Sequence, residues 1–217
     1  MTTAMGSSKV LLSMEESATN VDDCGYVQGA TRSEFGSRSD LHEVSLTLCS
    51  SSDVNVARLG LHALGVERER DPGPIDDPDH PHMRAAPEIL DRFRDDVTAW
   101  HIAYSLSCSF GASVNELYER LISDWSYIVR LQVAVNISAG ILEDSSVEVG
   151  GLIRRLLTGP HPSPRRFAVS ALSGESAAAF PWRLEELQRA ATDSNERVRA
   201  EAFEALQGLG ASGSSED

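Results

Sequence analysis

A helix-like pattern that returns every 30 to 43 residues or so is the feature that most constrains the fold of this chain. Its clearest copy lies near the C-terminal end, where four apolar side chains share one face of an expected helix: Val198, Ala202, Phe203 and Leu206. Asn195 is placed to cap the start of that helix, and Gly208 and Gly210 are placed to end it. One such unit cannot bury its apolar face alone, so the pattern predicts units that stack on one another.

Four earlier copies share this frame, and they begin at Val56, Ala99, Val129 and Pro164. Asp53 and Ser126 precede two of them in the capping position, and proline is tolerated in the first turn of a helix. A second amphipathic stretch precedes each copy, over 41–49, 86–94, 114–123, 147–157 and 183–191. The chain therefore reads as helix A, turn, helix B, repeated about five times between residues 41 and 210. Four prolines within 71–81 predict a loop after the first repeat.

The segments outside the repeats have a different composition. Residues 1–39 are rich in Ser, Thr and Gly and carry no sustained period, which predicts a mobile N-terminal segment. Residues 40–210 form the expected repeat domain, and residues 211–217 read as a disordered tail.

The repeats resemble the HEAT-repeat family. The last copy carries the resemblance best, through Asp193, Asn195, Val198, Arg199, Ala202, Leu206 and Gly208. The resemblance implies an all-α, right-handed superhelical solenoid of about five helical hairpins. An arginine in the family's repeat turn often bonds a neighbouring turn carboxylate; Arg130, Arg165 and Arg199 hold that position here, with Asp124 and Asp193 as candidate acceptors. In the degenerate copy at Ala99, Trp100 stands where the family often has arginine.

The charge balance argues against two classes of partner. With 19 basic and 33 acidic residues, the chain has a formal net charge of −14, which disfavours binding to nucleic acid or to an anionic membrane. No apolar run approaches the ~20 residues of a membrane span. The three cysteines, Cys24, Cys49 and Cys108, form no CxxC pair and read as reduced thiols. We therefore expect a cytoplasmic protein.

Catalytic and metal-binding motifs are sparse. The string Asp76–His82 gathers carboxylates and imidazoles, but its two histidines flank a proline and it reads more simply as a solvated acidic loop. His42, His62, His101 and His161 read as surface or packing residues. The sequence has no phosphate loop, nucleophile elbow or zinc helix. We expect no enzyme activity, cofactor or metal.

A local basic cluster interrupts the acidic chain. Between Val149 and Gly174 lie Arg154, Arg155, Arg165 and Arg166, with no carboxylate among them. Stabilisation of helix ends and repeat turns explains these arginines and is the favoured interpretation. A site for phosphate or an acidic peptide is the alternative.

In a HEAT-like solenoid the B helices line the concave side, so residues off their buried faces are candidates for partner binding. The predicted binding face comprises Leu59, Ile102, Val135 and Phe167, with Arg165 and Arg166 at one rim. The alternative is that these apolar residues pack beneath adjacent repeats.

These features favour a non-enzymatic interaction module, an adaptor or regulatory subunit that binds another protein of unknown identity, with a monomer favoured as its own state. Two enzymes with HEAT-like repeats are alternatives. One is an alkylpurine DNA glycosylase, suggested by Trp100, Trp125, Trp182 and the arginine cluster but opposed by the net charge. The other is a lyase that attaches a bilin chromophore, for which no pocket is identified.

Overall fold

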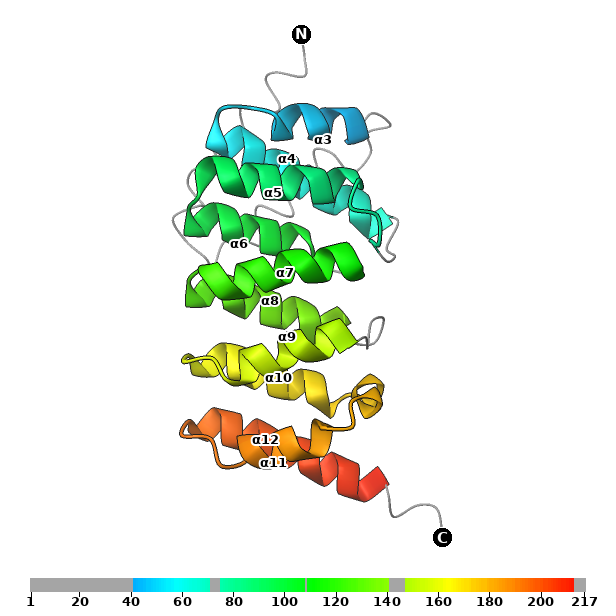
Figure 1. The fold of residues 1–217 in the computed structure, drawn as a ribbon, viewed down its shortest axis with the longest axis vertical. Helices are drawn as coiled ribbons and strands as arrows, with labels where there is room; N and C mark the ends of the chain where they lie inside the picture. The colour runs from blue at the N-terminus through cyan, green and yellow to red at the C-terminus, as the bar shows by residue number, and fades with distance from the viewer. Residues whose placement is uncertain (1–40, 71–74, 108, 141–146, 213–217) are drawn as a thin grey trace. The chain divides into compact units, whose positions relative to one another are not determined.

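The computed structural model describes residues 41–70, 75–107, 109–140 and 147–212. The described part of the chain is all-α and contains no β-strand (Figure 1). It divides into two compact units, residues 1–109 and residues 110–217, and each unit is described by itself. The predicted N-terminal segment lies outside the described residues, and so does all of the tail beyond Ser212.

The described residues of unit 1 form four helices: α3 (Leu41–Cys49), α4 (Val54–Arg70), α5 (Pro81–Phe93) and α6 (Asp96–Ser105). The Asp53 carboxylate caps α4, accepting the Asn55 N–H at 2.9 Å, as its place in the repeat predicts. The Asp95 carboxylate caps α6 through the Thr98 N–H at 2.9 Å. Helix α5 begins earlier than its apolar pattern predicts, because Pro81 fits the first turn and His80 caps it.

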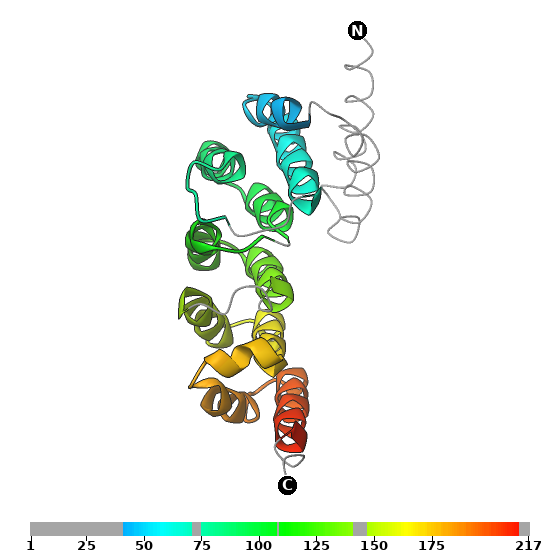
Figure 2. The same ribbon diagram turned by 90° about the vertical axis from the view of Figure 1, so that its right-hand side faces the viewer.

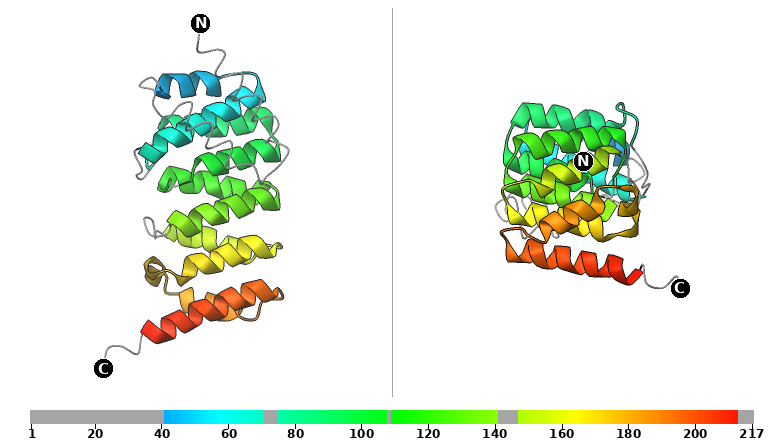
Figure 3. Two further views of the ribbon diagram at one scale, coloured as in Figure 1. Left: turned by 180° about the vertical axis from the view of Figure 1, so that it is seen from behind. Right: turned by 60° about the horizontal axis from the view of Figure 1, so that its bottom comes forward.

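Unit 2 holds six α-helices within its described residues: α7 (Ala112–Asp124), α8 (Tyr127–Gly140), α9 (Val147–Leu157), α10 (Pro162–Ser173), α11 (Arg183–Ala190) and α12 (Glu196–Ser212). A short 3₁₀ helix, η2 (Glu175–Ala179), follows α10. In unit 2 the helices form two layers, with α7, α9 and α11 in one and α8, α10 and α12 in the other (Figure 2). Seen from behind in Figure 3, the second layer runs from α8 (green) through α10 (yellow) to α12 (orange to red).

Helix α12 confirms one predicted end and corrects the other. The Asn195 side chain accepts the Arg197 N–H at 3.0 Å and so caps the helix as expected. Gly208 and Gly210 do not end it, because the helix continues to Ser212 and neither glycine adopts a positive φ. A glycine costs a helix only about 1 kcal/mol relative to alanine, so it permits a stop without imposing one.

The buried faces of the B helices largely follow the predicted frame. Val129 and Val133 in α8, Ala168 in α10, and Ala202 in α12 are fully buried. Phe203 is a correction, because its side chain is 53 % exposed although the pattern placed it on the buried face.

Helix α4 is the centre of unit 1, and every residue from Ala57 to Leu64 is buried. Helices α3, α5 and α6 all pack against it. A helix that is buried all round has no solvent face, so the apolar positions of α4 belong to the core.

Gly60 permits the close contact between α3 and α4. A Cβ at this position would lie 2.5 Å from the Cys49 backbone nitrogen and 2.9 Å from the Ser45 carbonyl oxygen, so α3 would have to move. We expect Gly60→Ala to lower the free energy of unfolding by about 1–3 kcal/mol, in spite of alanine's better helix propensity. Gly151→Ala is the matched control, because a Cβ there would meet no atom within 4 Å beyond its own stretch of helix. Urea unfolding followed by circular dichroism compares the two, and an unchanged midpoint for Gly60→Ala would contradict the close packing.

Candidate functional site

Arg165 forms the contact expected of a repeat-turn arginine. Its Nε and Nη2 donate to the two carboxylate oxygens of Asp193, both at 2.8 Å, and its Nη1 donates to the Gly159 carbonyl at 2.8 Å. The hydrogen bond from Arg165 is the main cause that holds the pKa of Asp193 below its usual value. Both side chains are mostly buried, so Arg165 joins α10 to the turn before α12 and is not free at the rim of a binding face.

Arg58 makes the corresponding contact in unit 1. Its Nη2 donates to Asp95 at 2.7 Å and its Nε donates to the Thr98 hydroxyl at 3.0 Å, which joins α4 to the start of α6. The sequence frame aligns Ala57, and not Arg58, with Arg165. If Arg58 is aligned with Arg165 because they make the same contact, the first repeat is shifted by one residue from its predicted frame.

Two more arginines of the basic cluster are held by contacts inside unit 2. The Arg154 guanidinium lies 4.6 Å from the centre of the Trp182 ring, and its Nε is 3.3 Å from the Glu186 carboxylate. Arg155 pairs with Glu119 and donates to the Ser123 hydroxyl at 2.6 Å. With Arg165, three of the four arginines therefore have partners inside unit 2. The Arg165 contact is of the kind that the favoured interpretation predicts, while the partners of Arg154 and Arg155 were not predicted.

Arg166 differs from the other three. Its guanidinium lies 5.1 Å from the centre of the Phe167 ring, and it has no carboxylate partner among the described residues. Phe167 is half-buried, as are Leu131 and Val135 on the neighbouring helix α8. We call this set, Leu131, Val135, Arg166 and Phe167, the α8–α10 face. It combines partly exposed apolar surface with one cation.

Leu59 and Ile102 do not belong to an exposed face. Both side chains are 0 % exposed, and Leu59 packs with Leu41, Ala63 and Val66 in the core of unit 1. This corrects their predicted partner-binding role in favour of the packing alternative. The reason is the all-round burial of α4, together with the packing of α6 against it.

A buried histidine pair in unit 1 is the feature that the sequence reasoning missed. His62 Nε2 and His101 Nδ1 are 2.7 Å apart, and both side chains are almost fully buried. Burial lowers the pKa of His62 to about 4, and burial together with the His62 and Arg58 charges lowers the pKa of His101. Trp100 and Tyr104 stack beside the pair. The available signal was the separation of 39 residues, about one repeat, between two B helices.

The acidic loop before α5 has a structural role. The Asp77 carboxylate accepts the Asp79 N–H at 2.8 Å, and His80 Nδ1 accepts the His82 N–H at 3.2 Å. His82 is buried, and its Nε2 lies 2.9 Å from the Ser105 hydroxyl. Among the described residues, no group of three or more metal-binding side chains gathers at one place.

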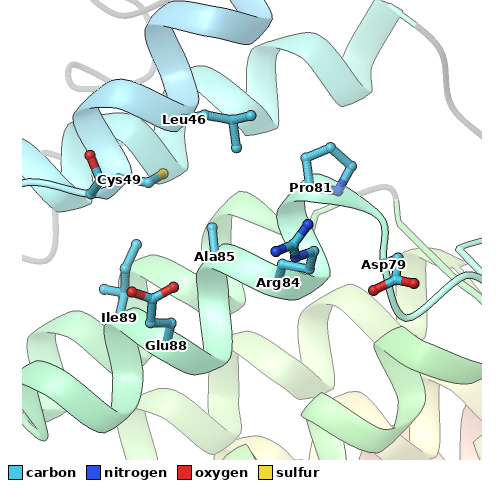
Figure 4. Close-up of a pocket in the computed structure, with 9 residues that line it drawn as sticks. Leu46, Cys49, Asp79, Pro81, Arg84, Ala85, Glu88 and Ile89 are labelled. Carbon is cyan, nitrogen blue, oxygen red and sulfur yellow. The ribbon is translucent and has the colours of Figure 1, made fainter.

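A small cleft lies between α3 and α5 (Figure 4), with a volume of about 250 Å³. Leu46, Cys49, Ala85 and Ile89 supply its apolar lining, and Asp79, Arg84 and Glu88 supply charge. Burial raises the pKa of the Cys49 thiol to about 12, so this cysteine is protonated at neutral pH and is a poor nucleophile. Cys49 is therefore not a catalytic nucleophile in this cleft.

Comparison with known proteins returned no match: no family model, no curated protein and no solved structure is similar to this chain. Among the helices that the structure describes, none combines the length and the apolar character needed to cross a membrane.

Proposed function

We propose that this chain is a non-enzymatic protein-interaction module, built as a HEAT-like right-handed solenoid, which binds a partner protein on the α8–α10 face. The alternating A and B layers of unit 2 and the two arginine–aspartate junctions, Arg58–Asp95 and Arg165–Asp193, support the repeat architecture. In such arrays the function lies in the surface that the stacked helices present.

The observation that carries the proposal is the contrast between Arg166 and the other cluster arginines. Arg154, Arg155 and Arg165 are neutralised by carboxylates within unit 2, while Arg166 lies beside half-buried Phe167 with no such partner in the described part of the chain. A cation next to partly exposed apolar surface suits an amphipathic segment that brings an acidic residue.

The neighbouring helix α12 adds polarity to this surface. At the positions that correspond to Phe167 and Ser170, it carries Glu201 and Glu204. The partner segment that fits best places its acidic residue over α10 and a basic residue over α12.

The DNA glycosylase alternative gains nothing from the arginine contacts. A DNA-binding surface needs cations that are free to meet phosphate, and three of the four cluster arginines are already paired. The Trp182 ring already stacks on Phe180 and contacts the Arg154 guanidinium, so these contacts compete with the stacking of a base. We therefore retain the interaction module as the proposal.

The test compares Phe167→Ala and Arg166→Glu with the wild type as baits in a native lysate. We expect each variant to retain its helical circular dichroism and to bind the captured partner roughly tenfold more weakly, because one removes apolar contact and the other reverses the charge. Leu184→Ala and Arg197→Glu are the matched controls, since both side chains are exposed and lie outside the α8–α10 face. If both test variants hold the partner as tightly as the wild type, this face is not the binding site.

A further inference from the structure

The B helices of unit 2 repeat one stripe of three residues, spaced i, i+4 and i+7. The members are Arg130, Ala134 and Ile137 on α8, Arg165, Val169 and Leu172 on α10, and Arg199, Phe203 and Leu206 on α12. On α8 and α10 the apolar members are buried, at 0 to 5 % exposure. On α12 Phe203 is 53 % exposed and Leu206 is half-buried. The apolar side chains of this stripe are therefore buried on α8 and α10 but partly exposed to solvent on α12.

The arginines of α10 and α12 show the same difference. Arg165 donates to the Gly159 carbonyl through Nη1 and to the two Asp193 carboxylate oxygens through Nε and Nη2. Arg199 repeats the first half of this contact, because its Nη1 donates to the carbonyls of Asp193 and Ser194 at 2.7 and 3.0 Å. Within the described residues its Nε and Nη2 hold no carboxylate. In Arg199, the two nitrogens that correspond to those of Arg165 bound to Asp193 are therefore available to a carboxylate.

We infer that the α12 stripe, Arg199, Phe203 and Leu206, is a docking site for an α-helix of another protein that carries an aspartate in the turn just before the helix begins. The packing of α12 on α10 indicates what such a helix looks like, because α12 covers the stripe of α10 while Asp193 pairs with Arg165. An incoming helix of the same kind would cover Phe203 and Leu206 and pair its aspartate with Arg199. A second copy of this chain is a poorer occupant through α12, since its own Asp193 is already bound to Arg165.

This inference goes beyond the proposed function, because it concerns a different surface. The α8–α10 face uses Val135, Arg166 and Phe167, and the stripe uses none of them. The bidentate pairing of arginine with carboxylate supplies orientation, and burial of the phenylalanine supplies affinity. Each surface can therefore fail its own test without affecting the other.

The probe is a fluorescent peptide of residues 191–209, with a lactam bridge joining positions 200 and 204 to hold it helical; both residues are exposed in α12. It is titrated against the full chain and followed by anisotropy. We expect saturable binding that weakens roughly tenfold or more with Phe203→Ser and with Arg199→Gln. An Asp193→Asn peptide should bind the wild type more weakly, yet bind the Arg199→Gln variant as the unmodified peptide does.

Leu184→Ser and Arg197→Gln are matched controls that should leave peptide binding unchanged, because each alters an exposed residue outside the stripe. Phe167→Ala should also leave it unchanged, which separates this site from the α8–α10 face. Binding that is absent, or equal for wild type and an Arg199→Gln, Phe203→Ser double variant, would overturn the inference. So would sedimentation showing that the chain alone dimerises through Phe203.

Discussion

Ala202→Asp is expected to lower the free energy of unfolding of unit 2 by about 3–5 kcal/mol, the cost typical of a buried and unpaired charge. Ala202 lies in the middle of α12 with no exposed surface, on the side that packs against α10 and α11. An aspartate there must stay ionised without water, take up a proton, or force α12 away from its neighbours. All three outcomes are costly, and the loss is a large share of the stability of a domain this size.

The matched control is Ala200→Asp, which makes the same change two residues away on the exposed side of α12. Helix propensity and net charge change equally in the two variants, so the difference between them reports burial alone. Urea unfolding followed by circular dichroism is the measurement, and the control is expected to shift by no more than about 0.5–1 kcal/mol. If the two variants unfold at the same urea concentration, Ala202 does not occupy the buried position assigned to it.

The helices themselves could be predicted because each carries its own signal. The spacing of apolar residues located α3 and α9 at their observed bounds, and Asp53 and Asn195 cap α4 and α12 as their positions predict. These are local effects of backbone geometry and capping, which require no knowledge of neighbouring elements. A contact of the Arg165–Asp193 kind was implied by the resemblance to HEAT repeats, which named Asp193 as one of two candidate acceptors for three arginines.

The exposed surface could not be predicted in the same way. The helical period placed Leu59 on the exposed face and Phe203 on the buried face of their helices. In the structure Leu59 is fully buried and Phe203 is about half exposed. The difference arises from the number of helices that surround each one: α4 is enclosed by three, while α12 stands last in its layer of unit 2. Helical periodicity describes one helix, and exposure depends on the helices around it.

The histidine pair predicts that unit 1 loses stability as the pH falls from about 6.5 to about 4. The pKa of His62 lies below its unfolded value because burial penalises the charged ring. The unfolded chain therefore takes up protons first, so stability is complete above the unfolded pKa and declines as the pH approaches the folded one. A pKa lowered from 6.5 to about 4 corresponds to about 3 kcal/mol lost for His62 alone.

Hydrogen exchange of α4 and α6, corrected for intrinsic rates and compared with α10, measures this loss locally. The double variant His62→Leu and His101→Leu should remove most of the pH dependence, because replacing both partners leaves no buried polar group behind. His161→Gln is the matched control, since His161 is exposed and belongs to unit 2. The carboxylate of Asp95 also faces α4 through Arg58, and it is present in both the wild type and the double variant, so the comparison between them isolates the two imidazoles. If the protection of α4 begins to fall between about pH 6 and 5, the effect belongs to the imidazoles. If it is unchanged down to about pH 4, the histidine pair is not held neutral by burial.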